Sequence, residues 1–348
     1  MNTTVNGINI SYPDLGFAFN PIRVFIGNYP SNRIVTLESN SVKTERETYG
    51  NTHDLSFDLS AIARSLFNRF EFYKVEEVDT TLIKTLSFTL SDSNGVFYTG
   101  SIPIIWGALQ IGETYTQNKI LTYFPGFPFT VPLYVQSDVV LKANDEEFKT
   151  IAAGKHNLDI SGIDATGKIV ISVFTSEYYK IQDFTFDFTF GPERVLNPKG
   201  LDIQINIADC PSDGIYLRWI NKYGEYNYFL FRSSVISSEV KNIDIAYDSL
   251  FYTTDLTDNY HLGTGKNIGK SISESQKLFA PLIDSNTFGL LMGLVESPVV
   301  DMFFGYDSDN NPKWISVSVA DGTFTQSTAH LQDFELFIIP NKKQVQTL

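Results

Sequence analysis

Hydrophobic and polar residues alternate along much of this chain with a period of two. The clearest run is residues 183–190, where phenylalanine occupies every even position and Asp or Thr every odd position. Because successive side chains of a strand point to opposite faces of its sheet, this run predicts a strand with one apolar face. Similar patterns predict strands at residues 23–26, 85–90, 96–99, 129–135, 139–142, 168–174, 201–207, 299–304 and 314–319.

Helical spacing of apolar residues occurs in a few short segments. Asp58 can cap a helix over residues 59–70, whose apolar positions repeat every three or four residues. Ser271 and Glu274 have the spacing of a capping box, which predicts a short helix over residues 271–280. Another short helix is predicted over residues 287–295 and ends before a Ser-Pro pair.

The strongest candidate boundary is residues 191–200, which contain two prolines and two glycines between predicted strands. We interpret this segment as a linker and expect a mainly β protein of two domains. Residues 1–190 are predicted to form an antiparallel β-sandwich or barrel with one packed helix. Residues 201–348 are predicted to form a smaller α+β domain with an aromatic hairpin and two short helices.

Composition and charge narrow the possible partners. The 28 Phe and 18 Tyr suit the half-buried surfaces of sheets. With 26 Lys and Arg against 40 Asp and Glu, the formal net charge is −14. A nucleic-acid partner would require a basic stripe to neutralise phosphates, so we expect none.

The chain has no segment typical of a membrane protein. Residues 1–9 lack the charged and apolar regions of a secretory signal. The longest apolar run, residues 288–295, is far shorter than the roughly 20 residues of a membrane helix. Cys210 is the single cysteine, which fits synthesis in a reducing cytoplasm. We expect no membrane partner.

Two segments resemble ligand-binding loops but depart from the required pattern. A phosphate-binding loop ending in Gly-Lys-Ser at Ser271 requires glycine at the position of Thr264. A calcium loop beginning at Asp307 requires glycine where Pro312 stands and glutamate where Ser318 stands. We interpret the first as a flexible loop and the second as a turn between strands, and we expect no cofactor.

Candidate catalytic and metal-ligating residues form no recognisable constellation. The four histidines are widely scattered, and one cysteine makes a structural zinc site implausible. No Gly-x-Ser-x-Gly motif indicates a nucleophile. Glu76, Glu77 and Asp79, together with residues 145–147, include enough carboxylates for a glycosidase pair, but such runs are usually solvated loops. We therefore expect no metal site and no enzymatic activity.

Residues 214–232 have the most distinctive pattern. Two aromatic-rich strands flank Asn221-Lys-Tyr-Gly224, a short loop whose glycine can adopt positive φ. This predicts a β-hairpin with one apolar face, whose outward residues still include Tyr or Trp. Exposed aromatics are enriched at interfaces, so Trp219, Tyr226 and Tyr228 are the predicted interface residues.

The order of elements over about residues 200–340 resembles the C-terminal half of virion proteins from tailed bacteriophages of Bacteroidetes-type hosts. The resemblance rests on the hairpin, the two short helices, and aromatic patterns at residues 297–304, 314–324 and 331–337. Residues 1–190 resemble the ring-forming domain of distal-tail proteins in fold class. The resemblance implies a structural virion protein, synthesised in the host cytoplasm, that forms a homo-oligomeric ring or collar and contacts other virion tail proteins.

Two other classes of function are alternatives to this one. A carbohydrate-binding or receptor-binding β-sandwich module would use exposed aromatics, for which Tyr178 and Tyr179 are candidates. A hydrolase would place two carboxylates in one pocket and raise the pKa of one of them.

Overall fold

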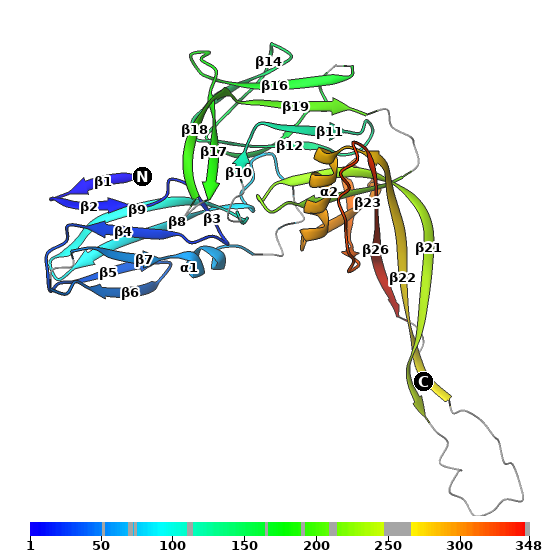
Figure 1. Ribbon diagram of the computed structural model, residues 1–348, viewed down its shortest axis with the longest axis horizontal. Coiled ribbons are helices and arrows are strands. Elements are labelled where there is room, and N and C mark those ends of the chain that lie inside the picture. Colours follow the sequence, from blue (N-terminus) through cyan, green and yellow to red (C-terminus); the bar gives the residue numbers. More distant parts are fainter. Residues whose placement is uncertain are drawn as a thin grey trace, which may run out of the picture. The chain divides into compact units, whose positions relative to one another are not determined.

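The computed structural model describes residues 1–50, 53–68, 72, 75–109, 114–163, 166–188, 192–208, 214–246 and 266–344. Over these ranges the protein is mainly β, as the alternation predicts, with six sheets and two helices (Figure 1). The chain divides into two compact units. Unit 1 comprises Met1–Cys210, Trp219–Tyr228 and Glu296–Val299, and unit 2 comprises Pro211–Arg218, Phe229–Val295 and Val300–Leu348.

The N-terminal part of unit 1 is a β-sandwich, one of the two forms predicted, but its strands lie within residues 2–105 and not over the predicted 1–190. One core cluster takes Val24 and Phe57 from the first sheet, and Val35 and Phe88 from the second, so the two sheets pack face to face. The first sheet has the order β1 (Asn2–Val5), β2 (Ile8–Ser11), β4 (Arg23–Gly27) and β7 (Leu55–Asp58). The second has the order β3 (Gly16–Phe17), β9 (Gly95–Ile105), β8 (Ile83–Asp92), β5 (Ile34–Ser39) and β6 (Val42–Glu47).

The rest of unit 1 contains three further sheets. Their strand orders are β10 (Thr114–Thr116), β17 (Gln182–Phe188) and β18 (Pro192–Gly200); β11 (Lys119–Tyr123), β19 (Asp202–Ile207), β16 (Lys168–Thr175), β13 (Val139–Ala143) and β14 (Glu146–Ile151); and β12 (Thr130–Val135) with β15 (Gly154–Asp159). The strands predicted by alternation are confirmed wherever the structure describes them.

A seven-stranded sheet dominates unit 2, and its strands β20 and β21 cross the division between the units. Its order is β24 (Pro312–Ser316), β23 (Val300–Tyr306), β20 (Ile215–Ile220), β21 (Tyr226–Ala246), β22 (Lys266–Ile283), β26 (Gln332–Gln344) and β25 (Ser318–Val319). Helix α2 (Ser285–Glu296) packs on this sheet through Phe288, whose ring centroid lies 5.5 Å from that of Phe334.

The predicted linker is wrong. Pro192–Gly200 forms strand β18, which pairs antiparallel with β17, and the division between units falls near residue 210. Proline is tolerated here because β18 is the edge strand of its sheet and Pro192 is its first residue, so the missing N–H groups need not interrupt a ladder.

The helix predictions have mixed outcomes. The segment predicted as helix 271–280 belongs to β22, where Ile272 pairs with Val240 on one side and with Lys343 on the other. Backbone pairing with two neighbouring strands outweighs the local capping signal. Helix α2 confirms the prediction over residues 287–295. Helix α1 (Ser60–Ser65) is shorter than predicted, although the Asp58 carboxylate accepts a hydrogen bond from the Ser60 N–H at 2.9 Å.

The hairpin at the start of β21 is confirmed, and its loop fits closely within unit 1. Gly224 has a φ of +69°, and a Cβ placed there would lie 2.2 Å from the Trp106 carbonyl oxygen. Facing it, a Cβ on Gly107 would lie 2.6 Å from the Lys222 carbonyl oxygen. The two segments approach closely only because both positions lack a side chain.

We expect Gly224→Ala to lower the free energy of unfolding by at least about 2 kcal/mol, because positive φ and a backbone clash both oppose a Cβ. Urea denaturation of the full chain measures this. The control is Gly289→Ala on the exposed side of α2, where a Cβ meets no atom within 4 Å. That change should stabilise the helix by about 0.5–1 kcal/mol. Equal stability of the Gly224→Ala variant and the wild type would contradict the close fit.

Candidate interaction surface

The structure buries the residues that the sequence predicts as an exposed interface. Trp219 and Tyr226 are each 1% exposed, and Tyr228 is 5% exposed. The Tyr226 hydroxyl donates to the Phe72 carbonyl oxygen, and the Tyr228 hydroxyl hydrogen-bonds the Thr130 hydroxyl at 2.8 Å. The expectation that these side chains face outward is wrong, because both faces of this hairpin are covered within the chain.

A buried ion pair holds the same hairpin. The Glu225 carboxylate accepts hydrogen bonds from the Lys119 ammonium at 2.5 Å and from the Tyr115 hydroxyl at 2.7 Å. Asn221, at the other end of the loop, accepts hydrogen bonds from the Tyr223 and Glu225 N–H groups through its side-chain oxygen. Sequence reasoning missed Glu225 and Lys119, because their 106 residues of separation gave no local signal.

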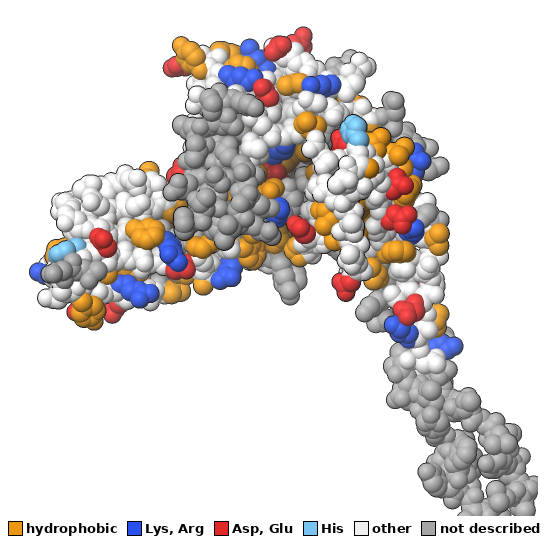
Figure 2. All heavy atoms as spheres, viewed as in Figure 1, with side chains coloured by type: hydrophobic (Ala, Val, Ile, Leu, Met, Phe, Trp, Pro, Cys, Tyr) orange, Lys and Arg blue, Asp and Glu red, His pale blue; other side chains and the backbone are white. Residues whose placement is uncertain are grey.

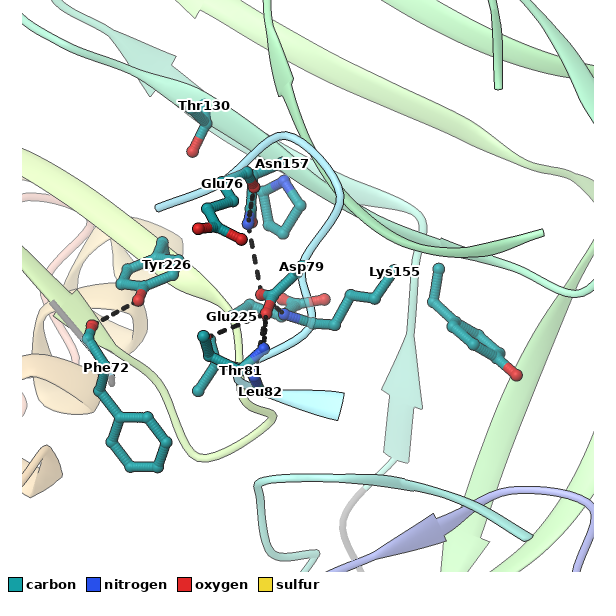
Figure 3. Close-up of polar contacts among 12 residues, drawn as sticks. Phe72, Glu76, Asp79, Thr81, Leu82, Thr130, Lys155, Asn157, Glu225 and Tyr226 are labelled. Carbon is teal, nitrogen blue, oxygen red and sulfur yellow. Dashed lines mark hydrogen bonds and ion pairs between the residues drawn. The ribbon is translucent and has the colours of Figure 1, made fainter. Parts of the chain in front are cut away.

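A second buried network surrounds Asp79 (Figure 3). One carboxylate oxygen accepts hydrogen bonds from the Thr81 and Leu82 N–H groups, both at 2.9 Å. The other accepts from the Lys155 ammonium at 2.9 Å and from the Asn157 amide at 3.3 Å. The network therefore fastens the loop before β8 to strand β15.

This network keeps the Asp79 carboxylate ionised and hydrogen-bonds both of its oxygens. Burial raises the pKa of Asp79, but the Lys155 ammonium and the hydrogen bonds of Leu82 and Asn157 outweigh it and hold the pKa below its ordinary value. Asp79 also lines a cavity of about 920 Å³. A general acid in such a cavity would need a raised pKa, and that of Asp79 is shifted in the opposite direction.

The other carboxylates singled out in the sequence also take part in local contacts. Glu77 forms an ion pair with Lys149, and Glu147 accepts a hydrogen bond from the Tyr178 hydroxyl at 2.9 Å. Asp307 accepts hydrogen bonds from the Asp309 and Asn311 N–H groups, which confirms the predicted turn between β23 and β24.

The described residues contain no group of three or more His, Cys, Asp and Glu side chains placed to hold a metal ion. They also contain no helix that is long and apolar enough to span a membrane. Thr264, which decided the interpretation of the glycine-rich loop, lies outside these residues.

Strands β21, β22 and β26 of unit 2 form an antiparallel ribbon (Figure 1). In one row across it, Gln276 of β22 pairs with Ile236 of β21 and with Ile338 of β26. Four residues further along β21, Ile272 of β22 pairs with Val240 and with Lys343. The β21 strand has 21 residues, whereas its other neighbour, β20, has six. Among the described residues, part of β21 therefore extends beyond β20 and has a partner strand on one side.

This part of β21, residues 233–242, combines exposed apolar and charged side chains. Val235, Ile236 and Val240 are 54%, 68% and 54% exposed. Glu239 and Lys241 are also exposed and form an ion pair with each other at 3.1 Å. On the face shown in Figure 2, hydrophobic side chains and charges of both signs lie along the ribbon. We call the side of residues 233–242 that faces away from β22 the β21 edge.

Tyr178 and Tyr179 form a second exposed patch, on unit 1. They are 54% and 70% exposed, and the Lys142 ammonium lies 5.3 Å from the centre of the Tyr178 ring. Tyr178 has a φ of +62°, which is uncommon for a bulky residue. The Glu147 carboxylate holds its hydroxyl and raises the pKa of Tyr178.

Comparisons with known proteins add little to this picture. No family model and no curated protein matches the chain. Among solved structures, a chain from "Structural insight into host cell surface retention of a 1.5-MDa bacterial ice-binding adhesin" aligns with 91% of this chain and 97% of that chain, with 11% identity and a TM-score of 0.17. A TM-score this low carries no argument about fold or function.

We expect Asp79→Asn and Lys155→Met each to lower the free energy of unfolding of unit 1 by about 3–5 kcal/mol, because each leaves one buried partner uncompensated. The double variant should lose less than the sum, as measured by a double-mutant cycle in urea. Lys43→Met, which removes the exposed pair with Glu38, is the control and should cost less than about 1 kcal/mol. Additive single effects would contradict the coupling.

The same pair predicts a dependence on pH. Because the pKa of Asp79 is lowered by folding, its contribution is fully present above its unfolded pKa of about 3.9 and is lost as the pH falls through the lower folded pKa. Wild-type protein should lose this stability on acidification, and Asp79→Asn should show a shallower loss. Parallel stability curves below pH 4 would contradict the assignment.

Proposed function

We propose that this protein is a non-enzymatic structural component of a phage virion, a ring- or collar-forming tail protein that contacts copies of itself and neighbouring tail proteins. The observation that supports the proposal is the β21 edge. A strand edge carries a row of backbone N–H and C=O groups that can pair with another chain. Here that row lies beside three exposed apolar residues, Val235, Ile236 and Val240.

The charge of the chain favours specific over casual association. At −14 per copy, two copies repel each other at long range. A contact that forms against this repulsion needs good complementarity and a total buried area above roughly 1,000 Å². Ordered strand pairing combined with burial of Ile236 and Val240 supplies part of that complementarity, and the ring surfaces implied by the resemblance supply the rest.

Replacing both Ile236 and Val240 with serine should weaken assembly without unfolding the chain, because both side chains are exposed. Truncation of a hot-spot residue typically costs at least about 2 kcal/mol, so we expect roughly a 30-fold loss of affinity. Mass photometry over a range of concentrations measures the loss, and quantitative mass spectrometry of purified virions gives the copy number in the native assembly.

The matched control is Val96→Ser, which removes an apolar side chain that is 66% exposed on the sandwich. It should leave assembly unchanged. A chain that is absent from virions, or that is monomeric both alone and in the native particle, would overturn the proposal.

The exposed patch of Tyr178 and Tyr179 supports a second candidate, a carbohydrate-binding or receptor-binding module. The Tyr178 ring, held by Glu147 and Lys142, and the exposed Tyr179 ring can stack on a sugar ring, and nearby charges can bind its hydroxyl groups. Saturable glycan binding that is lost in a Tyr178→Ala, Tyr179→Ala variant, together with a monomeric native protein, would favour this candidate over the structural one.

A further inference from the structure

The β21 edge lies beyond the N-terminal end of strand β20, which begins at Ile215. A Cβ on Gly214, which precedes β20, would lie 2.6 Å from the Phe231 carbonyl oxygen, so among the described residues β20 lies beside β21 up to about Phe231. Beyond that point, β22 is the strand that pairs with β21 among the described residues, with pairs from Val235–Lys277 to Asn242–Lys270. Residues 235–242 pair with β22 without a register shift, so they present a regular edge on their other side.

The sequence of this edge is complementary to itself. We infer that two copies of the chain pair antiparallel along the β21 edge, with Val240 of one copy opposite Val240 of the other. In this register Glu239 of each copy lies opposite Lys241 of the other. Both side chains are more than 60% exposed, and the pairing between copies extends the ion pair that they form within one chain. Residues directly opposite in an antiparallel pair approach to about 4.5–5.5 Å between Cβ atoms, and opposite charges there are favourable.

Neighbouring registers are worse for identifiable reasons. Centring the pair on Glu239 or on Lys241 places two like charges directly opposite each other. Centring it on Ser238 gains two contacts between Ile236 and Val240, but it leaves Glu239 opposite a serine and Lys241 opposite Val235. The register centred on Val240 matches charge with charge, valine with valine, and Ser238 with Asn242, although it leaves Ile236 opposite Asp244.

This inference rests on the proposed function because both use the β21 edge. It concerns the contact between two isolated copies, and not the contacts that close a ring. A pair of β21 edges is related by a two-fold axis and closes on itself, whereas a ring requires head-to-tail contacts through other surfaces. We therefore assign the paired state to the isolated chain, where it covers an edge that would otherwise promote aggregation.

Charge inversion tests the register. Lys241→Glu and Glu239→Lys each place like charges opposite each other twice, so each should weaken the dimer at least about tenfold, equivalent to about 1.4 kcal/mol. The double variant Glu239→Lys, Lys241→Glu restores both opposite-charge contacts and should return the dissociation constant to near the wild-type value. Lys313→Glu, the same charge change on exposed strand β24, is the control and should have no effect. Sedimentation velocity of the full chain measures all four.

Cysteine cross-linking tests the symmetry. In a background with Cys210 replaced by serine, Val240→Cys places two thiols opposite each other and should form a disulfide-linked dimer under mild oxidation. Ser238→Cys lies opposite Asn242 and should not. Efficient cross-linking of Ser238→Cys instead would establish the register centred on Ser238 and overturn ours.

The two proposals fail separately. The paired state is overturned if the isolated chain is monomeric, or if its dimer is unaffected by charge inversion and is not cross-linked through Val240→Cys. The virion role is then still tested by the copy number of the chain in purified particles. Absence of the chain from virions overturns the virion role even if the dimer forms as described.

Discussion

Backbone hydrogen bonding at strand edges is the constraint on which this structure depends. A chain built mainly of strands must pair, cover or charge every edge it exposes. Edge strand β6, Val42-Lys-Thr-Glu-Arg-Glu47, is exposed throughout and carries four charged residues, which discourages pairing. Edge strand β24 begins with Pro312, which lacks an N–H group. The β21 edge has one charge of each sign and three exposed apolar residues, so it lacks that protection.

Buried polar groups fix the loops that connect these strands. Glu225 with Lys119 holds the hairpin loop, and Asp79 with Lys155 holds the loop before β8. Such pairs stabilise little beyond an apolar replacement of similar shape, but the loss of one partner is costly, so they favour one arrangement of the loop over others. In the contacts described, the Glu225 and Asp79 carboxylates are therefore bound by partners that position loops.

The candidate surface shows why aromatic content misleads. Trp219, Tyr226 and Tyr228 lie in the most aromatic segment of the chain, and the same size that makes aromatics good interface residues makes them good core residues. Alternation identifies the two faces of a hairpin but not what covers each face. Here Phe72 and Thr130 contact Tyr226 and Tyr228, which share one face, and Asn227 on the other face is 6% exposed. Exposed apolar side chains lie instead on the less conspicuous Ser- and Val-rich continuation of β21.

The sequence alone determined the mainly β class, most strand positions, helix α2, the Asp307 turn and the glycine at the hairpin loop, because each depends on neighbours within a few residues. Only the tertiary structure decided that Pro192–Gly200 and residues 271–280 are strands, since both acquire their hydrogen bonds from partner strands. It also decided the ion pairs of Glu225 and Asp79 and the exposure of the β21 edge. Pairing between segments that are distant in the sequence leaves no local pattern in either segment. Whether a strand has an exposed edge depends on the length of the neighbouring strand.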